Sequence, residues 1–170
     1  MAFNYTSIPL MNAISSLPPE IVVIILSLMP GVEPRYAVVV GVILGLGFYE
    51  SLLLSLLSLI ILSTLLTLFI GYIDKVLASL TASKGVLSKI AGLYMKIRSR
   101  SASRARRSVE KWGLLGLVGF IAIPLPATGV YTGALASLIL GIRGFKLLGA
   151  LILGGVISMI ITSIMTNIIL

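Results

Sequence analysis

The sequence predicts an all-α polytopic membrane protein: an inverted repeat of a re-entrant helical hairpin plus a transmembrane helix, with the halves linked by a cytoplasmic amphipathic basic helix. Composition is the first observation. Of the 170 residues, 58% are hydrophobic and 11% are charged, whereas soluble domains have about 25% charged residues. Second, Pro and Gly clusters interrupt two of the four long apolar runs near their middles. Third, ten of the 13 Lys and Arg residues fall between Lys75 and Lys111.

The chain has no cysteine and no histidine. Their absence excludes thiol and imidazole nucleophiles and the common zinc, haem and iron–sulfur sites. The apolar runs also lack a pair of carboxylates for acid–base chemistry or for binding a metal ion. We therefore expect no enzymatic activity, no cofactor and no metal site.

Two apolar segments are too short on each side of their Pro and Gly clusters to cross a membrane. Residues 19–47 consist of about eleven residues, the cluster PGVEP at 30–34, and about thirteen more. At 1.5 Å per residue each arm covers roughly 17–20 Å of a hydrocarbon core about 30 Å thick. We therefore expect a re-entrant hairpin there, and a second over 111–142 with the tip IPLPATG at 123–129.

Two other apolar segments, 48–73 and 144–169, are long enough to cross completely. Basic residues favour the cytoplasmic side, so we place the loop over 74–110 in the cytoplasm, in the cell membrane of a multi-pass protein. The first hairpin then opens to the outside and the second to the cytoplasm. Residues 1–18 are expected to form an interfacial segment on the outer side.

An offset of 96 residues supports the inverted repeat. It aligns Pro30 with Pro126, and it aligns the small residues of the two second arms: Ala37 with Gly133, Gly41 with Ser137, and Gly45 with Gly141. Such stripes let helices approach closely in lipid, although they also occur in any membrane bundle. Two hairpins and two spanning helices provide little surface for enclosing a substrate, so we expect a homodimer with these small-residue faces as candidate contacts.

The hairpin tips are expected to form an anion site. In each hairpin the second arm begins at the tip, so its unpaired N–H groups and the positive end of its dipole point into a mid-membrane cavity. Pro34 suits a first helical position and Thr128 suits an N-cap. The backbone amides of Arg35, Tyr36 and residues 129–131 are then placed to cradle a phosphate or carboxylate.

Glu33 and Arg35 are ionisable residues at expected mid-membrane depth, where such residues are costly and usually functional. Arg35 is the expected counter-ion of an anion, and Glu33 is expected to exchange a proton during a transport cycle. The alternative is that the two side chains only neutralise each other and fix the shape of the tip. The predicted substrate-binding residues are Glu33, Arg35, Tyr36, Pro124, Pro126, Thr128, Gly129 and Tyr131.

The basic linker has apolar residues on one helical face, which is typical of a helix on a membrane surface. Its arginine–serine tract also has the composition of an RNA-binding segment. Anionic lipid of the inner leaflet explains the tract without a further partner, so we expect no nucleic acid. The residues predicted to face anionic lipid are Lys96, Arg98, Arg100, Arg104, Arg106 and Arg107.

Two motifs resemble those of a known family. LMPGVEPRYA at 28–37 and IPLPATGVYTGA at 123–134, with LGIR at 140–143 before a Gly-rich helix, are similar to the small multi-drug export proteins of prokaryotes. That family is regarded as a distant relative of the DedA superfamily, which implies paired re-entrant hairpins and movement of lipids or lipid-linked phosphates. Glu33 and Arg35 match the acid and the arginine of the first motif. The second tip departs from DedA because it lacks the typical arginines.

The leading hypothesis is therefore a transporter or flippase that binds the head of an anionic lipid or lipid-linked phosphate at the tips, with coupling to protonation of Glu33. A second hypothesis is efflux of cationic amphipathic drugs, in which Glu33 attracts the substrate. A third is a non-transporting scaffold whose basic helix binds anionic lipid or a partner protein.

Overall fold

The computed structural model describes residues 17–80, 86–125 and 128–169. Within them the regular secondary structure is helical, the helices are joined by short turns, and there is no strand. The seven helices are α2 (Pro19–Leu28), α3 (Glu33–Ile43), α4 (Phe48–Ser79), α5 (Val86–Trp112), α6 (Leu114–Ala122), α7 (Val130–Leu140) and α8 (Phe145–Ile169). Two stretches are long and apolar enough to span a membrane, Phe48–Val76 and Phe145–Thr166. The predicted all-helical class and the two long apolar helices are confirmed.

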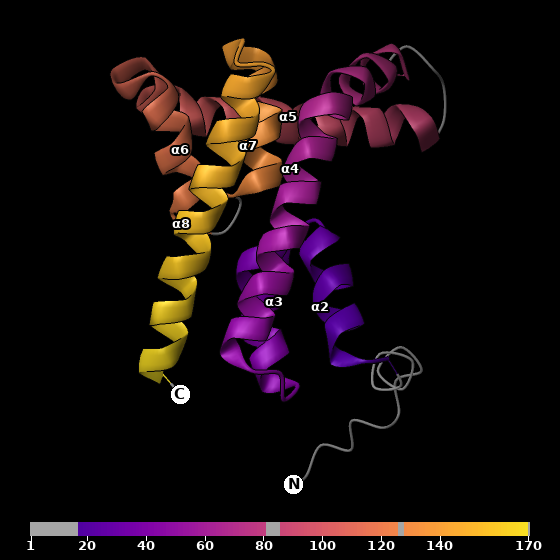
Figure 1. Cartoon of the computed structure of the whole chain (residues 1–170). Coiled ribbons are helices and arrows are strands. Elements are labelled where there is room, and N and C mark those ends of the chain that lie inside the picture. Colours follow the sequence, from indigo (N-terminus) through magenta and orange to yellow (C-terminus); the bar gives the residue numbers. More distant parts are fainter. Residues whose placement is uncertain (1–16, 81–85, 126–127, 170) are drawn as a thin grey trace, which may run out of the picture.

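Figure 1 shows α4 and α8 running in opposite directions, with a short helical hairpin beside each half of the molecule. The α2–α3 hairpin lies at the end where α4 begins, and the α6–α7 hairpin lies at the end where α8 begins. The turns of the two hairpins meet between these ends. Helix α5 lies across the end where α4 finishes and α8 starts (Figure 1), and it packs on α6 and α7.

The segment expected as one surface helix over 74–110 is divided in the structure. Its first residues continue α4 as far as Ser79, and α5 covers Val86–Trp112. On α5 the residues buried against its neighbours are small, among them Ala91, Ala102 and Ala105, whereas larger apolar side chains such as Leu93 are exposed. These exposed side chains lie on a surface suited to contact with lipid.

Glycines with positive φ follow the second arm of each hairpin. Gly45 has φ +94° after α3, and Gly141 has φ +72° as the left-handed C-cap of α7. Glycine is favoured there because its lack of a Cβ removes the cost of this backbone conformation. These two residues are one of the pairs that the offset of 96 aligns.

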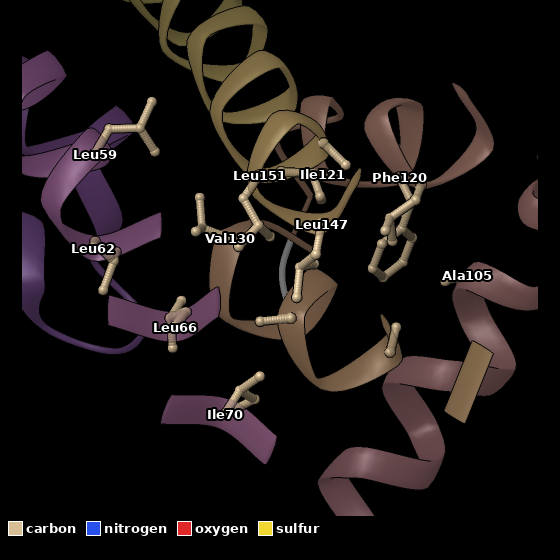
Figure 2. Close-up of a cluster of buried hydrophobic side chains, with 14 of the residues drawn as sticks. Leu59, Leu62, Leu66, Ile70, Ala105, Phe120, Ile121, Val130, Leu147 and Leu151 are labelled. Atoms are coloured by element: carbon tan, nitrogen blue, oxygen red, sulfur yellow. The ribbon is translucent and has the colours of Figure 1, made fainter. Parts of the chain in front are cut away.

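The core lies between the spanning helices and the hairpins, where leucine and isoleucine side chains from α4, α6 and α8 interdigitate (Figure 2). Glycine makes this contact close: a Cβ on Gly155 would lie 2.6 Å from Leu59, and one on Gly154 would lie 2.7 Å from Ile121. Any side chain larger than glycine at these two positions would therefore disrupt the packing of α8 against α4 and α6.

The small-residue stripes of the second arms are covered mainly within the chain. Ala37 and Ser137 have no exposed surface, and a Cβ on Gly133 would lie 2.5 Å from Ile121 of α6. Gly41 packs just as closely on Ser51 of α4. Intramolecular helix packing therefore already covers the inner members of these faces, and the homodimer stays a prediction.

Candidate substrate site at the hairpin tips

Among the described residues, three hydrogen bonds join the two hairpin tips. Arg35 donates from Nη2 to the backbone carbonyl of Thr128 at 2.8 Å. The backbone N–H of Val130 donates to Glu33 Oε2 at 3.4 Å, and the Tyr131 hydroxyl donates to the carbonyl of Leu28. Residues about a hundred positions apart in the sequence therefore form one site.

Glu33 is the first residue of α3, and among the described residues it is the one non-glycine residue with positive φ, at +60°. Its side chain is buried, with 5% of the residue exposed. The carboxylate fits against Gly129, where a Cβ would lie 2.1 Å from Oε2. Gly129 has φ +132° and ψ −165°, a conformation that essentially only glycine adopts. The second tip thus provides the space that the Glu33 side chain fills.

Arg35 is buried to the same extent and contacts several groups. Its Nε lies 3.7 Å from Glu33 Oε2, and its Nη1 donates to Ser158 Oγ of α8 at 3.5 Å. The guanidinium carbon also lies 4.9 Å from the centre of the Tyr36 ring. A buried charge is strongly destabilising without such partners, so these contacts, together with the Thr128 carbonyl, account for the presence of an arginine here.

Ser158 is the contact residue that the sequence-based prediction missed. It lies on α8, which is apolar on all sides, so no periodicity indicates which face of this helix meets the tips. Its burial beside Arg35 becomes evident only when the hairpins are placed against α8.

The expected open anion cradle is not open in this structure. The α7 N–H group that we expected to face a ligand donates instead to Glu33, so the carboxylate of the chain itself occupies the position of the anion. Thr128 was expected to cap α7, which is wrong. Gly129 is the N-cap residue and provides no side chain, while Thr128 Oγ1 bonds within its own turn, to the backbone of Ile123 and Leu125.

Two spaces adjoin this pair of charges. The inner one, between the tips, Leu59 of α4 and Ser158 of α8, has a volume of only about 10 Å³, which is at the lower limit for one water molecule. The outer one is a hollow of about 640 Å³, and drug-sized ligands occupy pockets of ~300–1,000 Å³. Its lining includes Glu33, Arg35, Tyr36, Ile97, Thr128, Tyr131 and Leu135.

The remaining predicted site residues lie in different places. Gly129 lines the inner space, Pro124 is partly buried in the second turn and lines neither space, and Pro126 lies outside the described residues. On α5 the side chains of Lys96, Arg100, Arg104, Arg106 and Arg107 are exposed. Arg106 pairs with Glu110 at 2.7 Å, whereas Arg98 turns inward and pairs with Asp74 at 3.1 Å.

The model of one protein family matches the chain over residues 33–161, and its description reads "Putative small multi-drug export protein". The chain belongs to this family. The matched region begins at Glu33 and includes the second tip and Ser158. The small multi-drug export family is described by export and not by a catalysed reaction, which together with the two long apolar helices indicates a membrane transporter. No curated protein and no solved structure matches the chain.

Proposed function

We propose that this small multi-drug export protein moves an anionic lipid or a lipid-linked phosphate across the cytoplasmic membrane, and that the hairpin tips bind the phosphate. The observation that carries the proposal is the position of the Glu33 carboxylate. It pairs with Arg35 and accepts the N–H of Val130 at the start of α7, which are the groups that bind phosphates at helix N-termini. A substrate phosphate would take the place of this internal anion.

The proposed membrane placement follows from helix length. The four hairpin helices have 9 to 11 residues, about 14–17 Å each, and so reach the middle of a core about 30 Å thick. The inverted repeat is supported by positions 33 and 129, which the offset of 96 aligns and which both have positive φ. Basic α5 is placed in the cytoplasm by the positive-inside rule.

In the proposed cycle the substrate enters through the outer hollow. Its acyl or polyprenyl chain lies against apolar and aromatic side chains such as Leu135 and Tyr131, and its head approaches Arg35. Glu33 then takes up a proton and releases Arg35 to the phosphate. The inner space of about 10 Å³ is too small for a phosphate, so the tips must separate from α8 and break the contact between Arg35 and Ser158. Alternating separation on the two sides would move the head across.

The proposal is tested in liposomes that contain the purified protein and a trace of fluorescent phosphatidylglycerol. Dithionite added outside quenches only the outer leaflet, so further quenching measures transfer between leaflets. Arg35→Ala should reduce the transfer rate more than tenfold, since a charge-assisted contact contributes about 1.5–3 kcal/mol, and Glu33→Gln should alter its pH dependence. Glu50→Gln is the matched control, because Glu50 is an exposed acid whose carboxylate accepts a hydrogen bond from the nearby backbone N–H of Gly47. Transfer at the wild-type rate in both tip variants would contradict the proposal.

A second candidate is efflux of cationic amphipathic drugs, which the family description favours. The hollow has a carboxylate and two tyrosine rings, Tyr36 and Tyr131, at its border, and such groups attract organic cations. Ethidium efflux from cells separates the two candidates. Drug efflux requires Glu33 and is insensitive to Arg35→Ala, whereas lipid transfer requires Arg35. If only removal of the bases between Arg98 and Arg107 abolishes function, the scaffold hypothesis replaces both.

A further inference from the structure

A second charged cleft lies away from the hairpin tips, at the end of the molecule where α4 finishes and α8 begins. It has a volume of about 250 Å³ and is bordered by α4, α5 and the turn between α7 and α8. Three bases border it, Lys75 from α4, Arg98 from α5 and Arg143 from the α7–α8 turn, together with one acid, Asp74. It shares no residue with the two spaces at the tips.

The acid of this cleft is already paired. Asp74 Oδ1 lies 3.1 Å from Arg98 Nε and accepts a hydrogen bond from the Tyr94 hydroxyl at 3.0 Å. Both charged side chains are largely covered, with 20% of Arg98 and 17% of Asp74 exposed. By contrast, Lys75 and Arg143 have no acidic partner within 4.0 Å among the described residues. The cleft therefore keeps an excess of two positive charges.

The walls of the cleft suit a phosphate attached to an apolar molecule. Gly144, with φ +59°, and Leu147 bring the start of α8 to the cleft, where unpaired first-turn N–H groups and the helix dipole favour an anion. Apolar side chains, among them Leu68 and Leu138, form most of the remaining lining, which also includes the hydroxyl residues Thr67 and Ser137. Lys75 is one residue before the end of the apolar stretch at Val76, so the proposed membrane placement puts it at the level of lipid headgroups.

We propose that this cleft binds the phosphate group of an anionic phospholipid at the cytoplasmic surface. Basic clefts between helices at that surface are suited to phosphate headgroups. Bound between Lys75, Arg98 and Arg143, the headgroup joins α4, α5 and the α7–α8 turn. The lipid thereby fixes α5, which carries Ile97 at the border of the tip hollow, in its place on the bundle. This site is independent of the transported substrate.

Native mass spectrometry of the purified full-length protein tests the site, with equimolar dioleoylphosphatidic acid and dioleoylphosphatidylcholine in the micelles. The double variant Lys75→Gln/Arg143→Gln should bind phosphatidic acid roughly 25-fold more weakly, about fivefold for each base. Both side chains are exposed, so far-UV circular dichroism should remain that of the wild type. Lys89→Gln/Lys111→Gln is the matched control, because it removes the same charge from exposed positions that lie outside the cleft and outside the predicted lipid-facing set, and it should keep most of the affinity.

Inorganic phosphate distinguishes the two possible sources of the ligand. If inorganic phosphate at high concentration competes with phosphatidic acid, the result supports a lipid site that recognises the phosphate group. Phosphate binding without any bound phosphatidic acid keeps the phosphate site but overturns its assignment to lipid. Equal binding of the two lipids, or equal losses in the cleft and control variants, overturns the proposal. None of these outcomes depends on transport, so the test is separate from that of the tip site.

Discussion

Replacing Gly129 with alanine probes the contact on which the tip site depends. The new Cβ would lie 2.1 Å from Glu33 Oε2 and 2.7 Å from its Cδ, so the carboxylate must leave its position. The φ of +132° and ψ of −165° add backbone strain of ~1–3 kcal/mol for any residue other than glycine. Loss of the charge-assisted bond from the Val130 N–H adds about 1.5–3 kcal/mol. We expect Gly129→Ala to destabilise the fold by roughly 2.5–6 kcal/mol.

Gly141→Ala is the matched control, because Gly141 also has positive φ, at +72°, but a Cβ there would meet nothing within 4 Å. It should cost only the strain, about 1–2 kcal/mol. The free energy of unfolding is measured in mixed dodecyl maltoside and sodium dodecyl sulfate micelles by far-UV circular dichroism. Combining Gly129→Ala with Glu33→Ala then isolates the clash, and the coupling energy should be about 2 kcal/mol. Equal effects of the two glycine substitutions, with no coupling to Glu33, would refute the reasoning.

Three further predictions concern other contacts. Gly116→Ala should destabilise the packing of α6 on α5 by more than about 2 kcal/mol, because its Cβ would overlap the backbone carbonyl of Ser108. Gly119→Ala should be neutral or slightly stabilising, because a Cβ there meets nothing. The free energies of unfolding of the two variants are compared in mixed micelles. Tyr131→Phe removes a bond between the tips and should cost ~0.5–1.5 kcal/mol, visible as faster maleimide labelling of a cysteine introduced at a tip. Burial, aided by Asp74, raises the pKa of Tyr94 from 10.0 to about 12. The contribution of this shift to stability is fully present below pH 10 and is lost as pH rises through 12, because ionisation of the phenol disfavours the fold. Tyr94→Phe cannot ionise and should therefore lose less stability than the wild type between pH 10 and 12, while identical alkaline unfolding profiles would contradict this role.

The sequence predicted the elements better than the contacts between them. The all-helical class and the two long helices follow from the composition and length of the apolar segments, which can be read from each segment alone. The proximity of Glu33 to residues near Gly129 followed from the two short arms, since both tips must end at a similar depth. The filling of the cradle by Glu33 was not predictable, because it depends on a carboxylate fitting the space left by one missing Cβ.

The other failures of the sequence-based prediction have similar physical causes. Thr128 has a good N-cap side chain, but the positive-φ backbone of Gly129 starts the helix one residue later and leaves the hydroxyl facing its own turn. The second charged cleft is bordered by Lys75, Arg98 and Arg143, which are distant in sequence. Each taken alone looks like an ordinary cytoplasmic base, and only the packing of α5 near the ends of α4 and α7 brings them together.

The left-handed backbone of Glu33 also makes the two halves of the protein unequal partners. At the matching position the second half has glycine, the residue that this backbone prefers, so one half contributes the charge and the other contributes the room for it. Glu33→Gly would relieve about 1–2 kcal/mol of strain, but it would leave the buried Arg35 charge without its carboxylate, which costs about 3–5 kcal/mol. The strain at Glu33 is therefore the smaller of the two effects, and the contacts of its carboxylate with Arg35 and the Val130 N–H account for a non-glycine residue in this backbone conformation.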